Sequence, residues 1–148
     1  MQDFPHHYAV SASAKSDTSI RLDSPGLEPI ESAGPAEFGG PGDLWSPETL
    51  LVATIADCLI LSFRAIARAA RLDWLSLKVD AVGDLDKVGR KTQFVRFKLR
   101  AELEIPEGSS EDKARKLLEK ADKTCLITNS MKAPSHLEMD IRARAIAD

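Results

Sequence analysis

The chain has 148 residues and a mass of 16.2 kDa, which is the size of one domain. Hydrophobic residues make up 43 %, enough for a single core, and 20 basic against 23 acidic side chains leave a formal charge of −3. That balance argues against nucleic-acid binding, which normally needs a basic field. We expect no membrane span, because no uninterrupted apolar run approaches ~18–20 residues. No secretory signal is visible at the N-terminus, so we expect one soluble, cytoplasmic domain over residues 1–148.

Alternating apolar positions and turn residues predict a strand-rich N-terminal region. The expected elements are a half-buried strand at 6–14, a turn at 15–18, a returning strand at 19–23 and a short strand at 27–32. In the first strand, Tyr8 and Val10 lie on the face that we expect to be buried. Glycines and prolines between residues 33 and 46 predict a loop.

A long helix follows this loop. Ser46 can cap it, Pro47 suits its first position, and Glu48 meets the positive end of its dipole. The helix is expected to continue to about Ala70. It is apolar nearly all round as far as Phe63, which predicts burial on every side. Because one small chain cannot easily enclose such a helix, we infer that a second subunit covers part of it.

The second half of the chain again combines strands with helices. Alternation predicts strands at 74–82 and 95–105, joined by a turn at 86–91. A helix at 111–122 with Ser109 as its cap, a short helix at 123–131 with Thr124 as its cap, and a last strand from Leu137 to Ala145 complete the order. This βββ–α–ββ–α–α–β order predicts an α+β fold with a mostly antiparallel sheet.

The chain has two cysteines, Cys58 in the long helix and Cys125 near the start of the short helix. Their separation differs from that of a zinc pair or a CxxC redox motif. A structural disulfide is disfavoured in a reducing cytosol. From the count alone, both could be buried cysteines that pack as small hydrophobes.

The local sequence adds a second interpretation. Residues 38–63, FGGPGDLWSPETLLVATIADCLILSF, contain a glycine-rich loop, a Ser-Pro-Glu helix start, and Cys58 ten positions after Glu48. The late segment 123–129, KTCLITN, carries Cys125 near a helix start. Together with the order of strands and helices, this pattern resembles the OsmC/Ohr family of thiol peroxidases.

The resemblance implies an OsmC-like fold, in which an antiparallel sheet wraps around a long central helix in an intertwined homodimer. It implies the reduction of organic hydroperoxides, in protection against oxidative or osmotic stress. Cys58 becomes a sulfenic acid, Cys125 resolves it as a disulfide, and an external dithiol reduces the disulfide. No cofactor and no metal are expected, since His6, His7 and His136 show no ligand spacing.

Activation of Cys58 is the open question. It is about the twelfth residue of its helix, too deep to gain from the N-terminal dipole, and burial would raise its pKa, so it needs a cation or another donor. Cys125, at a helix start, would instead face unpaired amides.

In the family, a glutamate orients an arginine over the first cysteine. Glu48 lies roughly 15 Å from Cys58 along its own helix, so we hypothesise that it acts from the partner subunit. The alternative is a first-turn acid favoured by the helix dipole. The family's arginine lies in the first β-turn, which here reads Lys15-Ser16-Asp17-Thr18, so Arg21 is the candidate substitute.

The missing arginine, and Leu126 where the family often has proline, keep a second function open. This alternative is a non-enzymatic OsmC-like dimer that binds an apolar small molecule or senses oxidants through its thiols.

Overall fold

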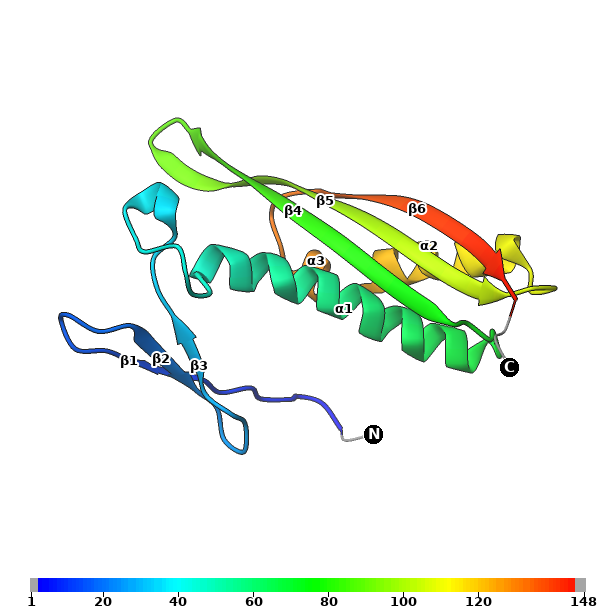
Figure 1. Cartoon of the computed structure of the whole chain (residues 1–148), viewed down its shortest axis with the longest axis horizontal. Coiled ribbons are helices and arrows are strands. Elements are labelled where there is room, and N and C mark those ends of the chain that lie inside the picture. The colour runs from blue at the N-terminus through cyan, green and yellow to red at the C-terminus, as the bar shows by residue number, and fades with distance from the viewer. Residues whose placement is uncertain (1–2, 146–148) are drawn as a thin grey trace. The chain divides into compact units, whose positions relative to one another are not determined.

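The computed structural model describes residues 3–145 and contains the expected order of strands and helices (Figure 1). The first two and last three residues of the expected domain lie outside this range. The chain divides into two compact units, Met1–Leu50 and Leu51–Asp148, which are described in turn.

The first unit holds a three-stranded antiparallel sheet in the order β1-β2-β3, made of β1 (Ser11–Ser13), β2 (Ile20–Asp23) and β3 (Ile30–Ser32). The expected second and third strands are confirmed with shorter bounds. The expectation for the first strand is wrong, because β1 has only three residues, all exposed, and Tyr8 is 91 % exposed. Alternating apolar residues do not lead to burial of a strand when no helix or second sheet of the same unit covers its apolar face.

The loop before the long helix is held by backbone contacts. The Ala33 amide donates to the Trp45 carbonyl at 2.9 Å, and a short 3₁₀ helix, η1 (Ala36–Phe38), lies between them. A Cβ at Gly40 would lie 1.9 Å from the Gly34 carbonyl oxygen, so only glycine fits there. This packing fixes the chain where it enters the helix.

Helix α1 (Pro47–Ala69) begins as predicted, with the Thr49 amide donating to Ser46 Oγ at 3.2 Å. Its buried residues form one i, i+4 stripe, namely Ile55, Leu59, Phe63 and Ala67. One chain therefore buries only one side of the helix, because one sheet face can cover only one stripe, and the expected second subunit stays a prediction.

By length and composition, α1 could also cross a membrane. It contains an 18-residue window with a mean hydropathy of 2.0, of which 22 % is buried. By this measure, the expectation that no stretch is long and apolar enough to span a membrane is wrong. The few charged residues in the window leave its mean hydropathy high. The observation is weak evidence for a membrane span, because the core helix of a soluble protein has the same properties.

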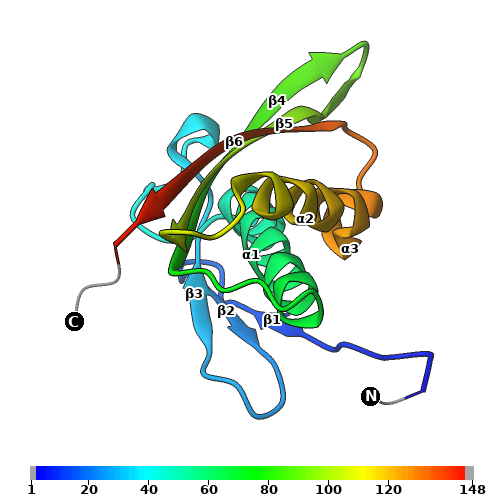
Figure 2. The same ribbon diagram turned by 90° about the vertical axis from the view of Figure 1, so that its right-hand side faces the viewer.

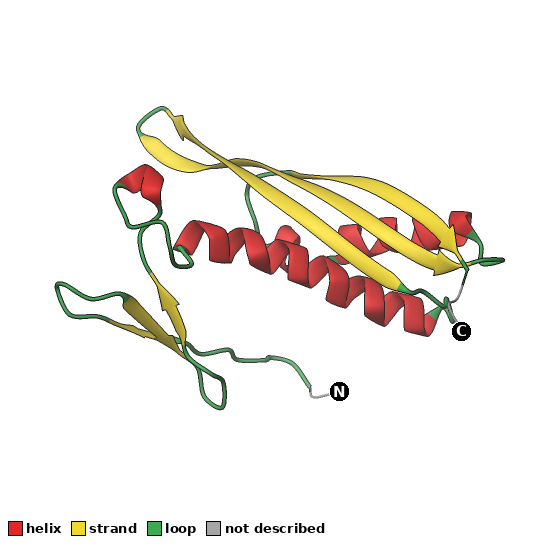
Figure 3. Cartoon of the chain, in the orientation of Figure 1, coloured by secondary structure: helices red, strands yellow, loops and turns green. Residues whose placement is uncertain are grey.

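The second unit is built on the sheet β4-β5-β6 (Figure 3), made of β4 (Ser76–Val88), β5 (Lys91–Pro106) and β6 (Ser135–Arg144). β4 and β5 form the expected hairpin, and its tip lies at Gly89 and Arg90. β6 runs parallel to β5, a pairing that the mostly antiparallel prediction did not include. A parallel return needs a long crossover, which the two helices between these strands provide.

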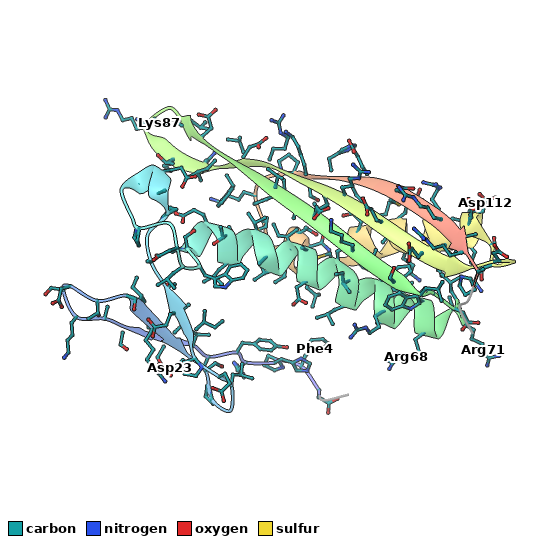
Figure 4. The ribbon with its side chains drawn as sticks, viewed as in Figure 1. Phe4, Asp23, Arg68, Arg71, Lys87 and Asp112 are labelled. Atoms are coloured by element: carbon teal, nitrogen blue, oxygen red, sulfur yellow. The ribbon has the colours of Figure 1, made fainter. Side chains whose placement is uncertain are left out.

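Helices α1 and α2 (Glu111–Thr124) cover the same face of this sheet (Figure 2). The core between them consists of the α1 stripe with residues of β5, α2 and β6, namely Phe97, Leu99, Ala101, Leu103, Ile105, Ala114, Leu118, Ala121 and Ile141. The opposite face carries exposed charges, including the ion pairs of Asp84 with Arg96 and Lys98. Figure 4 shows Lys87 at the projecting end of the hairpin.

The turns that surround α2 differ by one residue from the prediction. Ser110, not Ser109, caps the helix by accepting from the Lys113 amide at 3.2 Å. Thr124 ends α2 instead of capping the next helix, and its hydroxyl donates to the Lys120 carbonyl at 2.9 Å. Cys125 has extended backbone angles and separates α2 from α3 (Leu126–Asn129).

Candidate active site

Cys58 lies in the middle of α1 and is partly buried. It directly precedes Leu59, which belongs to the buried stripe, so its side chain lies beside the core. Its Sγ atom is 4.0 Å from Oγ of Ser62, one helical turn further along. The hydroxyl of Ser62 is therefore a weak hydrogen-bonding partner on the same helix.

Cys125 lies at the break between α2 and α3 and is fully buried, with 0 % of its surface exposed. Its amide donates to the Asp122 carbonyl at 3.3 Å, and its carbonyl accepts from the Asn129 amide at 3.1 Å and from Thr128 Oγ1 at 3.2 Å. These bonds hold the backbone on both sides of the residue, so the position of its sulfur is determined by two helix ends.

The fold brings the two cysteines together. Both are free thiols, and each is among the groups that shift the pKa of the other, although Cys58 lies in α1 and Cys125 between α2 and α3. Their interaction raises the pKa of Cys58 and lowers that of Cys125.

The two thiols differ in acidity. The pKa of Cys58 is raised, first by burial and then by its hydrogen bond to Cys125, and the Ile127 amide and Ser62 only partly oppose this. Burial also acts to raise the pKa of Cys125, but hydrogen bonds from Thr128 and Ile127 and from Cys58 outweigh it and lower the pKa overall. The side chain of Cys125 makes no cap hydrogen bond at the start of α3.

The other two predicted site residues are Arg21 and Glu48. Arg21 is on β2 of the first unit, where its guanidinium pairs with Asp23 at 2.9 Å. Glu48 lies in the first turn of α1, and its Oε2 atom is buried with no hydrogen-bond partner within residues 3–145. Within the second unit, the interactions that shift the thiol pKa values come from Ser62, Ile127, Thr128 and the thiols themselves.

Sequence reasoning missed Ser62, Ile127 and Thr128. The i+4 spacing from Cys58 could have indicated Ser62, because such residues share a helix face. Ile127 and Thr128 occupy the second and third positions of α3, whose amides face a capping residue. Finding them required placing the helix start at Leu126 instead of Thr124.

No metal site accompanies the thiols. In the described part of the chain, no group of three or more His, Cys, Asp or Glu side chains is arranged to hold a metal ion.

The protein has an α+β fold with one free cysteine in its long helix and a second at the break between two later helices. The family model for OsmC-like proteins matches residues 40–140, and the chain belongs to the OsmC-like family.

Solved structures share the fold over nearly the whole chain. An OsmC-like protein of unknown function from Vibrio cholerae has a TM-score of 0.82 at 21 % identity, covering 91 % of this chain and 99 % of that one. An organic hydroperoxide resistance protein OsmC from Legionella pneumophila has a TM-score of 0.71 at 22 % identity, covering 93 % and 98 %.

Among curated proteins, the chain is similar to the uncharacterized protein YmaD of Bacillus subtilis. The two are 23 % identical over 109 residues, which cover 72 % of this chain and 73 % of the relative.

Proposed function

We propose that this OsmC-like protein is a cysteine-based peroxidase that reduces organic hydroperoxides and protects against oxidative or osmotic stress. The observation that carries the proposal is that the free thiols of Cys58 and Cys125, which lie far apart in sequence, each shift the pKa of the other. Membership of the OsmC-like family and structural neighbours named organic hydroperoxide resistance proteins support the choice of substrate.

The reaction uses both sulfurs. The sulfur of Cys58, the more exposed of the two, attacks the terminal oxygen of the hydroperoxide; the O–O bond breaks and an alcohol leaves. The Cys58 sulfenic acid then reacts with Cys125, which forms the disulfide and releases water. An external dithiol reduces the disulfide and takes over its two electrons, so the cycle needs no cofactor and is suited to a reducing cytoplasm.

The proposal includes a homodimer. Only one stripe of α1 is buried although the helix is apolar nearly all round, and Leu61 is 51 % exposed on it. A second copy that covers this surface would remove it from water. The second copy could also bring a cation to Oε2 of Glu48. This atom is buried and has no hydrogen-bond partner in the described part of the chain.

Peroxide consumption tests the enzymatic proposal directly. With a lipoyl dithiol as reductant, we expect the protein to consume cumene hydroperoxide, and Cys58→Ser to lose essentially all of this activity because it removes the attacking sulfur. One equivalent of peroxide should remove two hydrogens per chain, measured by mass spectrometry. Consumption by Cys58→Ser at the parent rate contradicts the proposal.

A second function is favoured by one observation. The accessible thiol, Cys58, has a raised pKa and is protonated at neutral pH, which is unfavourable for a nucleophile. A dimer that binds an apolar small molecule, or that senses oxidants slowly through its thiols, is consistent with this. Disulfide formation without catalytic turnover in the dithiol assay would favour this alternative.

A further inference from the structure

The hydroxyl groups of serine and threonine in helices often donate to a backbone carbonyl of the preceding turn. On α1, the Thr54 hydroxyl donates to the Leu51 carbonyl at 2.7 Å. Carbonyls three or four positions earlier also accept from the hydroxyls of Thr49, Thr124, Thr128 and Ser130. Among the helical serines and threonines within residues 3–145, Ser62 is the exception, because its hydroxyl has the Cys58 sulfur as its partner and no backbone carbonyl.

On the basis of the peroxidase function proposed above, we propose that Ser62 is a further catalytic residue, whose hydroxyl donates a hydrogen bond to the oxygen atom that passes from the hydroperoxide to the Cys58 sulfur. This hydrogen bond forms while the sulfur attacks, and it persists in the sulfenic acid.

The two side chains lie on the same side of α1. Cys58 and Ser62 are four positions apart, and residues with this spacing lie one above the other along a helix. Both are partly buried, and no glycine or proline interrupts the helix between them. Regular helix geometry therefore determines their separation, which does not depend on contacts with another element.

The distance between the two atoms fits an added oxygen better than the sulfur itself. Cys58 Sγ and Ser62 Oγ are 4.0 Å apart, which is long for a hydrogen bond. An oxygen bonded to the sulfur on the side that faces Ser62 would lie closer to Oγ, near the ~2.5–3.0 Å of an O–H···O hydrogen bond. The interaction is therefore weak in the free thiol and strengthens as oxygen reaches the sulfur, which is the condition for lowering the barrier.

The reduced sulfur has another donor besides Ser62. Burial raises the pKa of Cys58, and the Ile127 amide of α3 opposes this more strongly than the Ser62 hydroxyl does. Removal of the hydroxyl should therefore change the ionisation of the thiol little and the transfer of oxygen more.

The atoms and electrons of the step balance without a proton from Ser62. The Cys58 sulfur loses its proton to solvent and gives an electron pair to the terminal oxygen of the hydroperoxide, so that the S–O bond forms and the O–O bond breaks. The alkoxide that leaves takes a proton from solvent and becomes the alcohol. The terminal oxygen keeps its own hydrogen, becomes the sulfenic acid oxygen, and accepts the hydrogen bond from Ser62.

A comparison of two reagents tests this role. Excess cumene hydroperoxide delivers an oxygen to Cys58, whereas iodoacetamide alkylates the same sulfur without one, and mass spectrometry of the Cys58 peptide follows both reactions. We expect Ser62→Ala to slow the oxidation by about tenfold, as for the loss of one hydrogen bond, and to leave the alkylation unchanged. Ser62→Thr keeps a hydroxyl and should restore the oxidation. Equal changes in the two rates, or no change in either, overturn the proposal.

Thr54→Ala is the matched control. Thr54 lies four positions before Cys58 on α1, it is exposed, and its hydroxyl already donates to the Leu51 carbonyl. We expect both rates to stay at the values of the parent protein. A selective loss of oxidation in Thr54→Ala as large as that in Ser62→Ala would contradict a specific role for Ser62.

Turnover separates this inference from the peroxidase function, because the comparison of reagents needs one oxidation of Cys58 and no dithiol. If Ser62→Ala shows the selective loss but the parent protein does not turn over with the lipoyl dithiol, the peroxidase function is wrong and the role of Ser62 in oxygen transfer stands. If the parent protein turns over and Ser62→Ala is oxidised at the same rate, the role of Ser62 is wrong and the peroxidase function stands. If excess hydroperoxide leaves Cys58 unoxidised, both are wrong.

Discussion

At the residue scale, a nucleophile needs both exposure and a low pKa, and the two cysteines divide these properties. Cys58 is the more exposed thiol, and Cys125 is the one with a lowered pKa. Burial acts to raise the pKa of both sulfurs, and hydrogen bonding acts to lower it, more strongly at Cys125 than at Cys58. The Ile127 amide of α3 acts on both thiols, so the pKa of Cys58 depends on a group outside its own helix.

Gly83 is a residue at which the backbone of β4 comes close to α1. A Cβ there would lie 2.7 Å from Cε1 of Phe94 and 2.9 Å from Cγ2 of Val52. Gly83→Ala forces both side chains to move, and we expect it to lower the free energy of unfolding by about 1–3 kcal/mol, measured by urea denaturation.

The matched control is Gly89→Asn at the hairpin tip. A Cβ at Gly89 meets nothing within 4 Å, and asparagine tolerates its positive φ of 63°. We expect a change well below that of Gly83→Ala. Equal effects of the two substitutions would show that the close approach of β4 to α1 does not limit stability.

The residues of the candidate site were predictable to different degrees. Cys58 and Cys125 stand out by type and by the motifs around them, each shifts the pKa of the other, and their catalytic roles stay predictions. Ser62 and Thr128 are ordinary polar residues whose effect depends on where a sulfur lies in space, which local sequence does not determine. The roles of Arg21 and Glu48 stay predictions.

At the element scale, the caps of α2 are a sensitive point of the fold. Ser109 fits a capping box with Asp112 in the sequence, but Ser110 accepts the hydrogen bond from the Lys113 amide. Ser110→Ala leaves that amide without its partner, so we expect a loss of about 1 kcal/mol in the free energy of unfolding. Thermal and urea denaturation measure it.

Ser109→Ala is the control one residue earlier, and it should change stability by only a few tenths of a kcal/mol, as expected for a surface substitution. If Ser109→Ala has the larger effect, the helix begins where the sequence pattern placed it.

Elements with strong local signals were predictable from sequence, and those defined by distant partners were not. Ser46 and Pro47 set the start of α1, and alternation over Val95–Ile105 found β5. The strand expected around Tyr8 failed because its partner layer is not specified locally. The parallel direction of β6 results from the crossover through α2 and α3, and the spacing of apolar residues does not predict it.

At the scale of the whole molecule, α1 carries apolar side chains outside its buried stripe, among them Leu61, which is 51 % exposed. Ile55, Leu59, Phe63 and Ala67 form the buried stripe, and 22 % of an 18-residue window of mean hydropathy 2.0 is buried. The hydrophobic effect favours covering this surface, and the proposed second copy does so symmetrically.

Leu61→Asp tests that arrangement. Leu61 is 51 % exposed on α1, so the substitution costs little within one chain but would bury an unpaired charge between two copies. We expect light scattering to show a dimer for the parent protein and a concentration-dependent shift to monomer for the variant. Val88→Asp, at a hairpin position 50 % exposed, is the control with similar exposure and the same added charge, and it should stay dimeric. A monomeric parent protein, or two variants that dissociate equally, would rule out α1 as the interface.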